Sequence, residues 1–318
     1  MKKKELNILI NSFTYRKLPL LDLVKKSKNK IDKKIKIFLG NNKSFPYSSF
    51  FKKNIINLPS CKDKNRYQIL KILKNLKIKF VIPTSDAELI FWSKYKKFYK
   101  LNGIIVFISQ HSSIKICLDK LSFHKYCKVK NIPDIKILSL KDCKKKNIKL
   151  VVKERFSHEK NELIINKDYN YVKKHLHKYK NPIIQKFIPG NEISVDAFLD
   201  ENSRVIGLFM RKREHVVDGE SQVTSIFRNR KLESSFTQYF ESLKLVGMVM
   251  LQAKIYKNKF YIIECNPRVG GASTLSIQNG LDVFFWQMKK IINERFIYKF
   301  KKGNKNRLFR FPVDFYLK

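Results

Sequence analysis

The first third of the chain alternates short apolar runs with longer segments of helical periodicity. Apolar residues recur every three to four positions in segments 66–76 and 87–99, which predicts helices there. Strands that alternate with helices are typical of a parallel α/β sheet, so we expect a parallel-sheet lobe within residues 1–112. The predicted strands of this lobe cover residues 6–12, 34–40, 80–85 and 104–109.

Alternating patterns of apolar and polar residues return in the second half of the chain. Ile193, Val195, Ala197 and Leu199 recur at every second position, which favours a strand. Further on, residues 250–264 read as two apolar-rich strands around the short loop Lys257-Asn258-Lys259. Asparagine can adopt left-handed backbone geometry, so this segment predicts a β-hairpin.

The predicted hairpin brings three oxygen donors together. If the loop closes symmetrically, Gln252 lies opposite Glu264, with Cβ atoms roughly 5 Å apart. Asn266 follows Glu264 by two positions and shares its face of the strand. Carboxylate and amide oxygens suit Mg²⁺ or Mn²⁺ better than zinc, and Mg²⁺ usually completes its shell with phosphate oxygens. The alternative is an edge hairpin whose polar side chains are solvated.

Arginines near this hairpin are candidate anion contacts. Arg268 follows the predicted metal ligands and precedes a glycine pair, so its guanidinium could reach a transferring phosphoryl group or an acceptor carboxylate. An arginine that only caps the turn is the alternative. Arg211 and Arg213, on one face of another predicted strand, offer a second anion contact that could select an acid substrate.

These residues together resemble the signature of ATP-grasp enzymes, especially the carbamoyl-phosphate-synthase large-subunit type and the pyrrolysine-biosynthesis-type ligases. The matching pattern is a glutamine followed by Glu-x-Asn-Pro-Arg, here Gln252, Glu264, Asn266, Pro267 and Arg268. The resemblance extends over most of the chain through segments in the same order and spacing, namely 114–136, 150–156 and 183–198.

The resemblance implies an α/β fold in which a parallel-sheet (pre-ATP-grasp) lobe precedes a two-lobed ATP-grasp α+β core. The small nucleotide-clamping lobe would cover residues 113–185, and a C-terminal lobe with the metal hairpin would cover 186–318. It also implies a ligase that uses ATP and Mg²⁺ (or Mn²⁺) to convert a small carboxylic acid into an acyl phosphate, which an amine then attacks. The chain has room for one ATP-grasp unit, so carbamoyl phosphate synthesis itself is not expected.

The same resemblance assigns nucleotide contacts one residue at a time. Lys120 and Lys153 would bind the ATP phosphates, and Glu192 would hold the ribose hydroxyls. The adenine contacts would come from the connection between the lobes, namely Gln185, Lys186 and Ile188. Ammonium groups neutralise phosphate, and a carboxylate accepts hydroxyl donors, so each role is chemically sensible.

One segment departs from the family pattern. Residues 153–162, which would form the mobile loop over the phosphates, contain no glycine. Glycine permits close backbone approach and positive φ, so its absence weakens the assignment of a phosphate lid. Arg155, Ser157 and Asn161 could substitute as side-chain donors. This departure motivates a second hypothesis, a nucleotide-binding module with little catalysis.

The formal net charge of +42 motivates a third hypothesis, nucleic-acid binding. Only 12 of the 68 basic residues are arginine, and the lysines are spread through every segment. Sequence-specific readers of DNA favour arginine for bidentate contacts to guanine. We therefore expect no specific nucleic-acid partner, only adhesion to polyanions at low salt.

Cysteine usage and hydropathy bear on the compartment. The five cysteines are scattered without a CxxC pair, which argues against a disulfide or zinc framework and for a reducing environment. No apolar run approaches the roughly 20 residues that a membrane-spanning helix needs. The sequence therefore predicts a cytoplasmic protein without a membrane partner, and it says nothing about oligomeric state.

Overall fold

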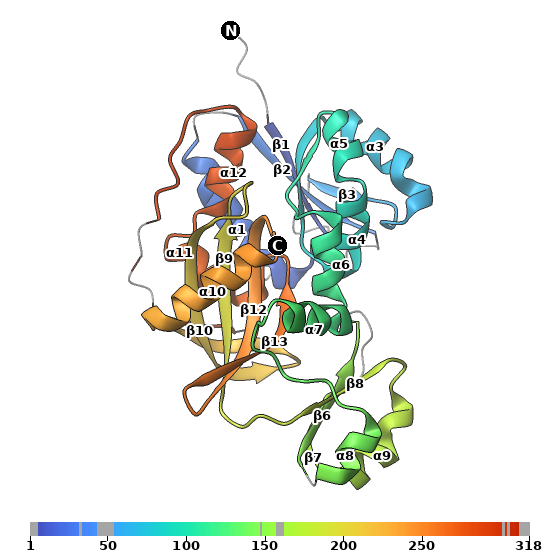
Figure 1. Ribbon diagram of the computed structural model, residues 1–318. Helices are drawn as coiled ribbons and strands as arrows, with labels where there is room; N and C mark the ends of the chain where they lie inside the picture. Colours follow the sequence, from blue (N-terminus) through green and yellow to red (C-terminus); the bar gives the residue numbers. More distant parts are fainter. Residues whose placement is uncertain are drawn as a thin grey trace.

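The structure is a computed structural model that describes residues 6–31, 34–42, 54–146, 148–156, 162–300, 303 and 306–311. Its described strands form sheets of five, three and six strands. Figure 1 shows the five-stranded sheet and its helices at the top, the six-stranded sheet below it and the small sheet at the lower right. The predicted mixed α/β architecture with an N-terminal parallel sheet is confirmed.

The first sheet has the strand order β3-β2-β1-β4-β5, and all its strand pairs are parallel. Its strands are β1 (Leu6–Asn11), β2 (Ile35–Asn41), β3 (Ile55–Asn57), β4 (Ile78–Pro83) and β5 (Ile105–Val106). Its helices are α1 (Leu18–Asn29), α3 (Arg66–Asn75), α4 (Asp86–Lys94) and α5 (Lys96–Leu101), and the short helix η1 (Tyr15–Lys17) leads into α1. β1 is buried along its whole length because it is central and covered on both faces, which explains its nearly continuous apolar sequence.

Two details of this lobe differ from the sequence-based prediction. The segment 87–99 was predicted as one helix, but it divides at Tyr95 into α4 and α5, because the backbone leaves helical geometry there (φ −98°, ψ 12°). Strand β3 and helix α1 were not predicted. β3 has only three residues, and α1 begins with a proline in its first turn within a lysine-rich stretch.

The small sheet has the order β7-β6-β8 and is antiparallel. Its strands are β6 (Leu150–Glu154), β7 (Ile164–Lys167) and β8 (Pro182–Lys186), and α8 (Leu140–Lys146), α9 (Tyr169–His175) and η3 (Leu176–Lys178) accompany them. A separate apolar cluster, which includes Leu138, Val152 and Val172, fills the space between this sheet and its helices. The small sheet therefore has a core of its own.

The large sheet has the order β13-β12-β9-β10-β11-β14 and is antiparallel throughout. Its strands are β9 (Asn191–Leu199), β10 (Val205–Val217), β11 (Glu220–Phe227), β12 (Gly247–Tyr256), β13 (Lys259–Asn266) and β14 (Arg307–Phe309). The alternation predicted for residues 193–199 is confirmed, because the four apolar side chains are buried in one cluster. This cluster lies between the sheet and α10 (Arg230–Ser242). The opposite face of the sheet is polar over part of its length and elsewhere buries Phe198, Phe209 and Met248 in another cluster.

Helices between the first and second sheets also pack on the large sheet. α6 (His111–Leu118) and α7 (Lys120–Val129) bury Cys117, Phe123 and Cys127 in the cluster behind β9, β10 and β12. The sequence division grouped these helices with the small lobe from residue 113 onward. The buried side chains of α6 and α7 pack on the large sheet, whereas the core of the small sheet begins at Leu138.

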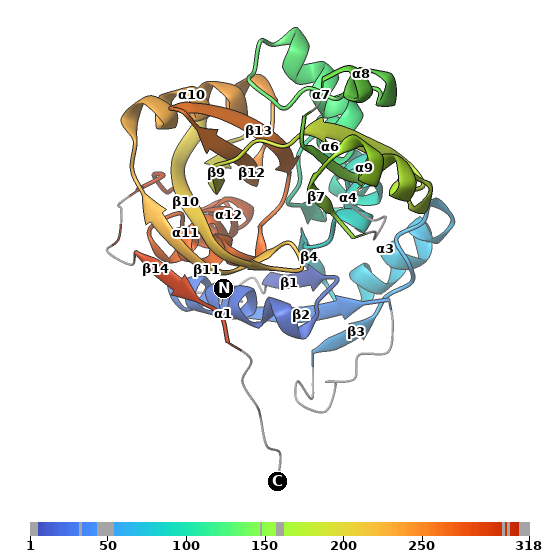
Figure 2. The ribbon, with the colours of Figure 1, turned by 90° about the horizontal axis from the view of Figure 1, so that it is seen from below.

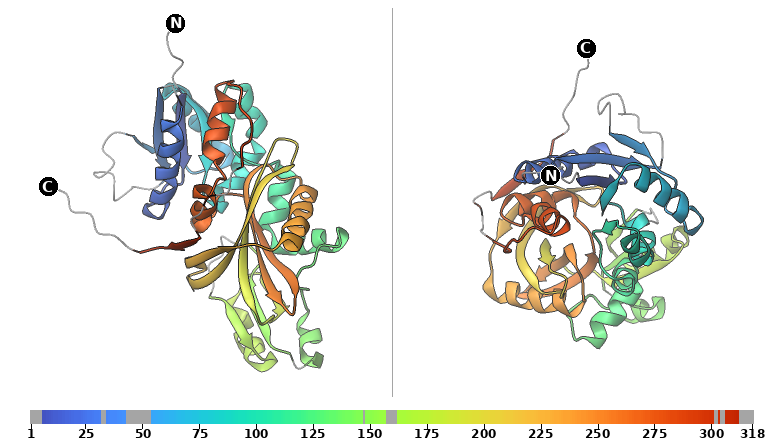
Figure 3. Two further views of the ribbon diagram at one scale, coloured as in Figure 1. Left: turned by 90° about the vertical axis from the view of Figure 1, so that its left-hand side faces the viewer. Right: turned by 90° about the horizontal axis from the view of Figure 1, so that it is seen from above.

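A third cluster joins the two ends of the described chain. Helix α12 (Val283–Ile291) packs against α1, and its Trp286 is 2% exposed within the cluster that contains β1 and β2 residues. Figure 3 shows α12 beside α1, with the large sheet beyond them. Within the described ranges, no helix has the length and apolar character needed to cross a membrane.

Candidate functional site

The hairpin β12–β13 places Gln252 opposite Glu264, as predicted, but by a different route. Tyr256 pairs with Lys259, so the loop has two residues, Lys257 and Asn258, rather than the predicted three. Both loop residues have positive φ (49° and 59°), the geometry of a tight two-residue hairpin turn. The predicted three-residue loop is therefore wrong.

A β-bulge restores the predicted register. Ala253 pairs with Ile262 while Gln252 pairs with Glu264, so Ile263 is the extra residue on β13. The bulge compensates for the shorter loop by one position. Without it, Gln252 would pair with Ile263, and the Glu264 side chain would point to the opposite face of the sheet.

Polar side chains gather on one face of the large sheet because the register aligns them across strands. Gln252 also lies opposite Ser194 on β9, and Ser194 in turn lies opposite Arg211 on β10. Lys254 lies opposite Glu192 in the same way. Side chains alternate along each strand, so one half of this face carries these polar positions and the other half carries Phe198, Phe209 and Met248, while the apolar cluster behind the sheet lies on the other face.

The three predicted metal ligands lie at the end of this polar face. The Glu264 side chain is 22% exposed, and its Oε1 accepts a hydrogen bond of 2.9 Å from Asn266 Nδ2. Because Asn266 Nδ2 points to Glu264, the amide oxygen of Asn266 points the other way. It is a second oxygen that could contact a cation. Among the described residues, no group of three or more His, Cys, Asp or Glu side chains could hold a metal ion. One carboxylate with two amide oxygens fits a cation such as Mg²⁺, which completes its shell with phosphate and water oxygens.

Two lysines converge on Glu264 from different elements. Lys120 is the first residue of α7, and its Nζ lies 3.9 Å from Glu264 Oε2. Lys153, on β6, donates from Nζ to the Ile263 carbonyl oxygen (3.3 Å) and is 7% exposed. Burial lowers the pKa of Lys153 to about 8, against the opposing effect of the Glu264 charge. The structure thus brings both predicted phosphate-binding lysines to the predicted metal ligand.

Asp119 fixes the start of α7 and with it the position of Lys120. Its carboxylate caps the helix and accepts two hydrogen bonds from Arg155, from Nε (2.6 Å) and Nη2 (2.5 Å). Burial tends to raise the pKa of Asp119, but the hydrogen bonds from Arg155 and Ser122 and the Arg155 charge together outweigh it, and the pKa falls to about 2. The backbone N–H of Lys120 also donates to the Arg155 carbonyl oxygen (3.2 Å).

Arg155 is thereby engaged at the base of the predicted phosphate loop rather than extended over the phosphates. The other two proposed substitutes for lid glycines, Ser157 and Asn161, lie outside the described residues.

The predicted adenine contacts lie on and just after β8. Gln185 is buried, and its Nε2 donates to the Ile135 carbonyl oxygen (2.5 Å). Lys186 is exposed at the end of β8, and Ile188 is half-buried in the connection to β9. These residues therefore lie at the connection between the small and large sheets, which is where the resemblance implied the adenine contacts would be.

The predicted ribose ligand, Glu192, lies near the start of β9 between two cations. Its Oε1 lies 2.8 Å from Arg213 Nε, and its Oε2 lies 3.6 Å from Lys254 Nζ. Burial lowers the pKa of Arg213, against the opposing effect of the Glu192 charge. Arg213 also donates from Nη2 to the Gly219 carbonyl oxygen (2.8 Å).

Two buried polar atoms on this face have no hydrogen-bond partner among the described residues: Ser194 Oγ and Arg213 Nε. The short contact between Arg213 Nε and Glu192 is an ion pair without hydrogen-bond alignment. Unsatisfied buried polar atoms are uncommon in folded proteins and call for a partner such as water or a ligand. Their position beside Gln252 and Glu192 is consistent with a polar ligand bound on this face.

Arg268 is held by a residue of the first lobe. Its Nε and Nη2 donate to the two carboxylate oxygens of Asp86 at 2.6 and 2.7 Å, and its Nη1 donates to the Val269 carbonyl oxygen (3.2 Å). Burial tends to lower the pKa of Arg268, but the Asp86 carboxylate outweighs it and raises the pKa. Asp86 is the first residue of α4, so the ion pair joins the two lobes.

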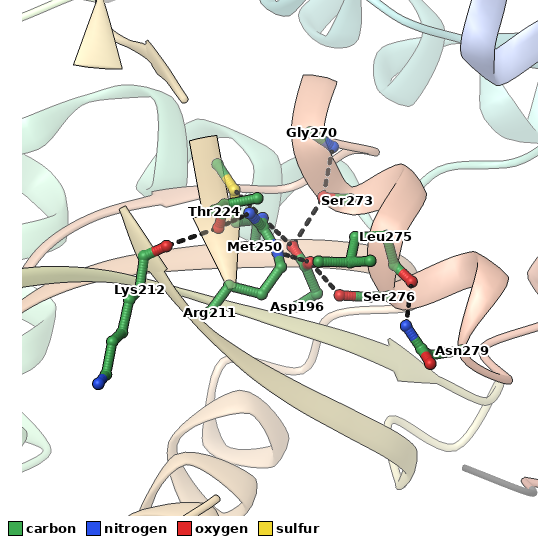
Figure 4. A network of polar contacts seen from close by, with 10 residues as sticks. All are labelled: Asp196, Arg211, Lys212, Thr224, Met250, Gly270, Ser273, Leu275, Ser276 and Asn279. Carbon is green, nitrogen blue, oxygen red and sulfur yellow. Dashed lines mark hydrogen bonds and ion pairs between the residues drawn. The ribbon is translucent and has the colours of Figure 1, made fainter. Parts of the chain in front are cut away.

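Arg211 is buried in a network behind the glycine pair, as Figure 4 shows. Its Nε and Nη2 donate to Asp196 at 2.6 and 3.2 Å, and Asp196 also accepts the hydroxyls of Ser273 (2.7 Å) and Ser276 (2.6 Å). Ser273 Oγ in turn accepts the Gly270 N–H (3.1 Å). Arg211 therefore positions the segment after Arg268, η4 (Gly271–Ser273) and α11 (Thr274–Gln278), and is not the exposed anion contact predicted from sequence.

A cavity of about 720 Å³ runs from the Arg268 partner to the start of α7. Its walls are mostly apolar side chains of α4, α6 and the end of β6, with carboxylates at both ends. They are Asp86, Ala87, Ile90, Ser112, Lys115, Ile116, Leu118, Asp119, Ser122 and Phe156. Sequence reasoning missed this cavity because no motif marks α4, and the matched segment 114–136 gave no role to the side chains of α6.

Comparison with known proteins adds a family match over part of the chain. Residues 178–307 match the family described as an ATP-grasp in the biosynthetic pathway with Ter operon. The matched segment contains the whole polar face and Arg268. No curated protein sequence matches the chain.

Solved structures resemble the chain over almost its full length. Biotin carboxylase from Campylobacter jejuni matches with a TM-score of 0.69 at 14% identity, covering 92% of this chain and 72% of that one. N5-carboxyaminoimidazole synthetase from Staphylococcus aureus, complexed with ADP, matches with a TM-score of 0.68 at 15% identity, covering 94% and 80%. L-amino acid ligase from Bacillus licheniformis matches with a TM-score of 0.68 at 16% identity, covering 92% and 75%.

Proposed function

From the ATP-grasp fold of this chain, we propose that it is an ATP- and Mg²⁺-dependent ligase that joins a small carboxylic acid to an amine through an acyl phosphate. The observation that carries the proposal is the convergence of Lys120 and Lys153 on Glu264. Two ammonium groups beside a carboxylate and two amides form a site for a polyphosphate with its cation. The resemblance in fold to an L-amino acid ligase makes this reaction class the natural one to test.

Within the site, each residue would have a distinct task. Gln252, Glu264 and Asn266 would hold Mg²⁺ (or Mn²⁺), which supplies positive charge to the phosphate oxygens when it is bound. Lys120 and Lys153 would contact the phosphates from the opposite side. These two lysines come from α7 and β6, so phosphate binding would tie the small sheet to the large one.

The nucleoside would lie along the connection between β8 and β9. Lys186 and Ile188 are accessible there, and the backbone of Gln185 lies beside them. Glu192 would accept the ribose hydroxyls, with Arg213 and Lys254 holding its carboxylate in place. The unsatisfied hydroxyl of Ser194 would gain a partner from the same ligand.

The chemical step requires a carboxylate oxygen of the acid to attack the γ-phosphorus of ATP. The bond from that phosphorus to the ADP oxygen breaks, and ADP leaves. An amine then attacks the acyl carbon, an amide bond forms and inorganic phosphate leaves. Arg268 would stabilise the negative charge on the transferring phosphoryl group, because its guanidinium is fixed in place before the reaction. Arg213 would contact a second anion.

The test is acid-dependent release of phosphate from ATP. A panel of amino acids, hydroxy acids and dicarboxylates is screened for stimulated ADP and phosphate release, and hydroxylamine is added to trap an acyl phosphate as a hydroxamate. Arg268→Ala should lower the stimulated rate by about 100-fold or more while changing ATP affinity little, since removing one fixed transition-state donor costs about that much. If no acid stimulates release, the ligase proposal is wrong.

Two alternative functions are each favoured by one feature of the sequence. A nucleotide-binding module with little catalysis would follow from the glycine-free segment 153–162, and it predicts ATP binding without acid-stimulated turnover. A nucleic-acid-binding protein would follow from the charge of +42 alone. We also propose the division into lobes at residues 112 and 185, and a cytoplasmic location, on the same grounds as in the sequence analysis.

A further inference from the structure

The carboxyl end of β4 lies near Arg268, which lines the same small pocket as Ile82 and Pro83. In the first sheet, β2 and β3 lie on one side of β1, and β4 and β5 lie on the other. The strand order therefore reverses at β1. Ligands of open α/β sheets bind outside the carboxyl ends of the strands at such a point. The Thr84 hydroxyl donates to the Asn11 carbonyl oxygen (2.7 Å) and joins the two strand ends. η1 with Lys17 follows β1, and Asp86 follows β4.

Arg310 reaches the same place from the far end of the described chain. Its Nη1 lies 3.0 Å from Glu220 Oε2 and 3.2 Å from the point where Gly271 would carry a Cβ. A larger residue at position 271 would press on this guanidinium. The backbone N–H of Arg310 donates to the Gln222 carbonyl oxygen (2.9 Å), which fixes it beside β11. Figure 2 shows β14 and β11 next to α1 and β1.

We call Lys17, Arg268 and Arg310 the cation cluster. The charges that act on the Lys17 ammonium include both other members of the cluster and the two neighbouring carboxylates, Asp86 and Glu220. Those carboxylates are already engaged: Asp86 by both of its oxygens with Arg268, and Glu220 with Arg310 and, at 3.4 Å, with Arg16.

Lys17 is the unmatched charge of the group. Among the described residues, no carboxylate lies within ion-pair distance of its ammonium, although the side chain is half-buried. Burial, with the Arg268 charge, lowers the pKa of Lys17 to about 8. Four cationic side chains, the cation cluster and Arg16, therefore lie near only two carboxylates, Asp86 and Glu220. Burying a cation without a counter-ion costs free energy, and a bound anion would remove that cost.

We propose that the cation cluster binds a second anionic group of the acid substrate, so that the protein selects acids with two negative charges over simple monocarboxylates. The reacting carboxylate would lie near Arg268 on the side of the polar face, and the second anionic group would pair with Lys17 and Arg310. The second group is a carboxylate or a phosphate, because both offer oxygens to an ammonium and a guanidinium. The cavity described above reaches Asp86, the partner of Arg268. This inference rests on the proposed ligase function.

The experiment compares acids of equal chain length that carry one carboxylate, two carboxylates, or one carboxylate and one phosphate. Wild type, Lys17→Met, Lys17→Arg and the control Lys71→Met on the exposed face of α3 are assayed for phosphate release at saturating ATP. We expect kcat/KM for one dianionic class to exceed that of the monocarboxylate by at least about tenfold. Lys17→Met should raise the KM for that acid about tenfold and leave the monocarboxylate and ATP constants within about twofold. Lys17→Arg and Lys71→Met should keep the preference.

A second readout does not depend on turnover. The same acids are added to each variant in a thermal unfolding assay, and the preferred dianionic acid should stabilise wild type and Lys17→Arg but not Lys17→Met. The dicarboxylate and phosphate arms identify which second group the cluster takes. Equal KM changes for all acids in Lys17→Met, or equal stabilisation of wild type by mono- and dianionic acids, would overturn the inference. Stabilisation by a dianionic acid without any stimulated phosphate release would instead refute the ligase function and leave the binding site standing.

Discussion

Arg268 and Asp86 form a two-bond ion pair between residues 182 positions apart, at 2.6 and 2.7 Å. It connects the loop after the metal hairpin to the first turn of α4, so the orientation of the guanidinium depends on the first lobe. Both residues are largely buried, with side chains 19% and 18% exposed. Burial tends to raise the pKa of Asp86, but the charge and hydrogen bonds of Arg268, together with the charges of Lys17 and Lys120, outweigh it and lower the pKa.

We therefore expect Asp86→Asn to act through Arg268 as the loss of a positioning residue. The amide keeps the shape of the carboxylate but removes its charge and one acceptor, so Arg268 should lose its fixed orientation. The acid-stimulated rate should fall roughly 10- to 100-fold with little change in the KM for ATP. Steady-state kinetics with varied ATP and varied acid separates the two constants.

A merely structural role for Asp86 predicts a different pattern. In that case Asp86→Asn would lower the melting temperature and leave kcat of the folded fraction unchanged. Asp63→Asn serves as the matched control, because Asp63 pairs with Lys94 on the surface near the same helix. An unchanged kcat for Asp86→Asn would exclude the positioning role.

Glu264 should dominate cation-dependent nucleotide binding, because it is the one charged member of the predicted metal trio. At a ligand concentration about 100 times Kd, Mg²⁺-ATP should stabilise the wild type by about 2.7 kcal/mol, which corresponds to a rise in Tm of roughly 5 °C. Glu264→Gln should abolish this rise while leaving the unliganded Tm within about 2 °C. Thermal unfolding with and without Mg²⁺-ATP measures both.

Glu201→Gln is the control for this substitution, because Glu201 pairs with Lys290 on the surface (2.7 Å). It should retain the full nucleotide-dependent rise in Tm. A Glu264→Gln variant that is still stabilised by Mg²⁺-ATP would remove Glu264 from the metal site.

Lys153 should make ATP binding depend on pH in the mildly alkaline range. Phosphate binds the ammonium form, and the free protein holds the pKa of Lys153 near 8, so affinity should be constant below about pH 8. Above it, affinity should fall by up to tenfold per pH unit until the higher pKa of the bound state is reached. Isothermal titration from pH 6.5 to 9.5 measures this decline, and Lys153→Arg, which stays charged, should flatten it.

The metal hairpin shows how far sequence reasoning reaches. Two apolar-rich runs and an asparagine in the loop located both strands, and the pairing of Gln252 with Glu264 was predicted correctly. The loop length was wrong, because sequence does not mark the bulge at Ile263 that offsets the two-residue turn. The loop is one residue shorter than predicted and β13 has one extra residue, Ile263, so the two differences cancel and the predicted register is correct.

The roles of residues that depend on tertiary packing could not be predicted from the sequence. Arg211 and Arg213 lie two positions apart and look equivalent in sequence, yet Arg211 is 1% exposed against Asp196 while Arg213 faces Glu192. Their roles are set by which carboxylate each strand neighbour supplies. Lys17 and Arg310 are far apart in the sequence and carry no motif, so only the folded structure shows that the charges of Arg268 and Arg310 both act on Lys17.

The Asp196–Arg211 pair should be strongly coupled in stability. Asp196→Ala would leave the buried Arg211 charge without its partner, at a cost of about 3–5 kcal/mol in the free energy of unfolding. The double variant Asp196→Ala/Arg211→Met removes both charges, so it should be less destabilised than Asp196→Ala alone. Urea unfolding of the two single variants and the double variant gives the coupling energy, and strict additivity would contradict the network.

The net charge of +42 should produce polyanion binding that is diffuse and sensitive to salt. Each phosphate that a lysine neutralises releases counterions, so log affinity should fall linearly with log salt, and affinity should be nearly lost by about 0.15 M. Because sequence preference needs side chains fixed against base edges, oligonucleotides of different sequence should bind equally. Fluorescence anisotropy with several duplex and single-stranded probes, from about 0.02 to 0.3 M salt, measures both properties. Tight and selective binding of one sequence near 0.15 M, where the Debye length is about 8 Å, would show that the lysines form a specific nucleic-acid surface.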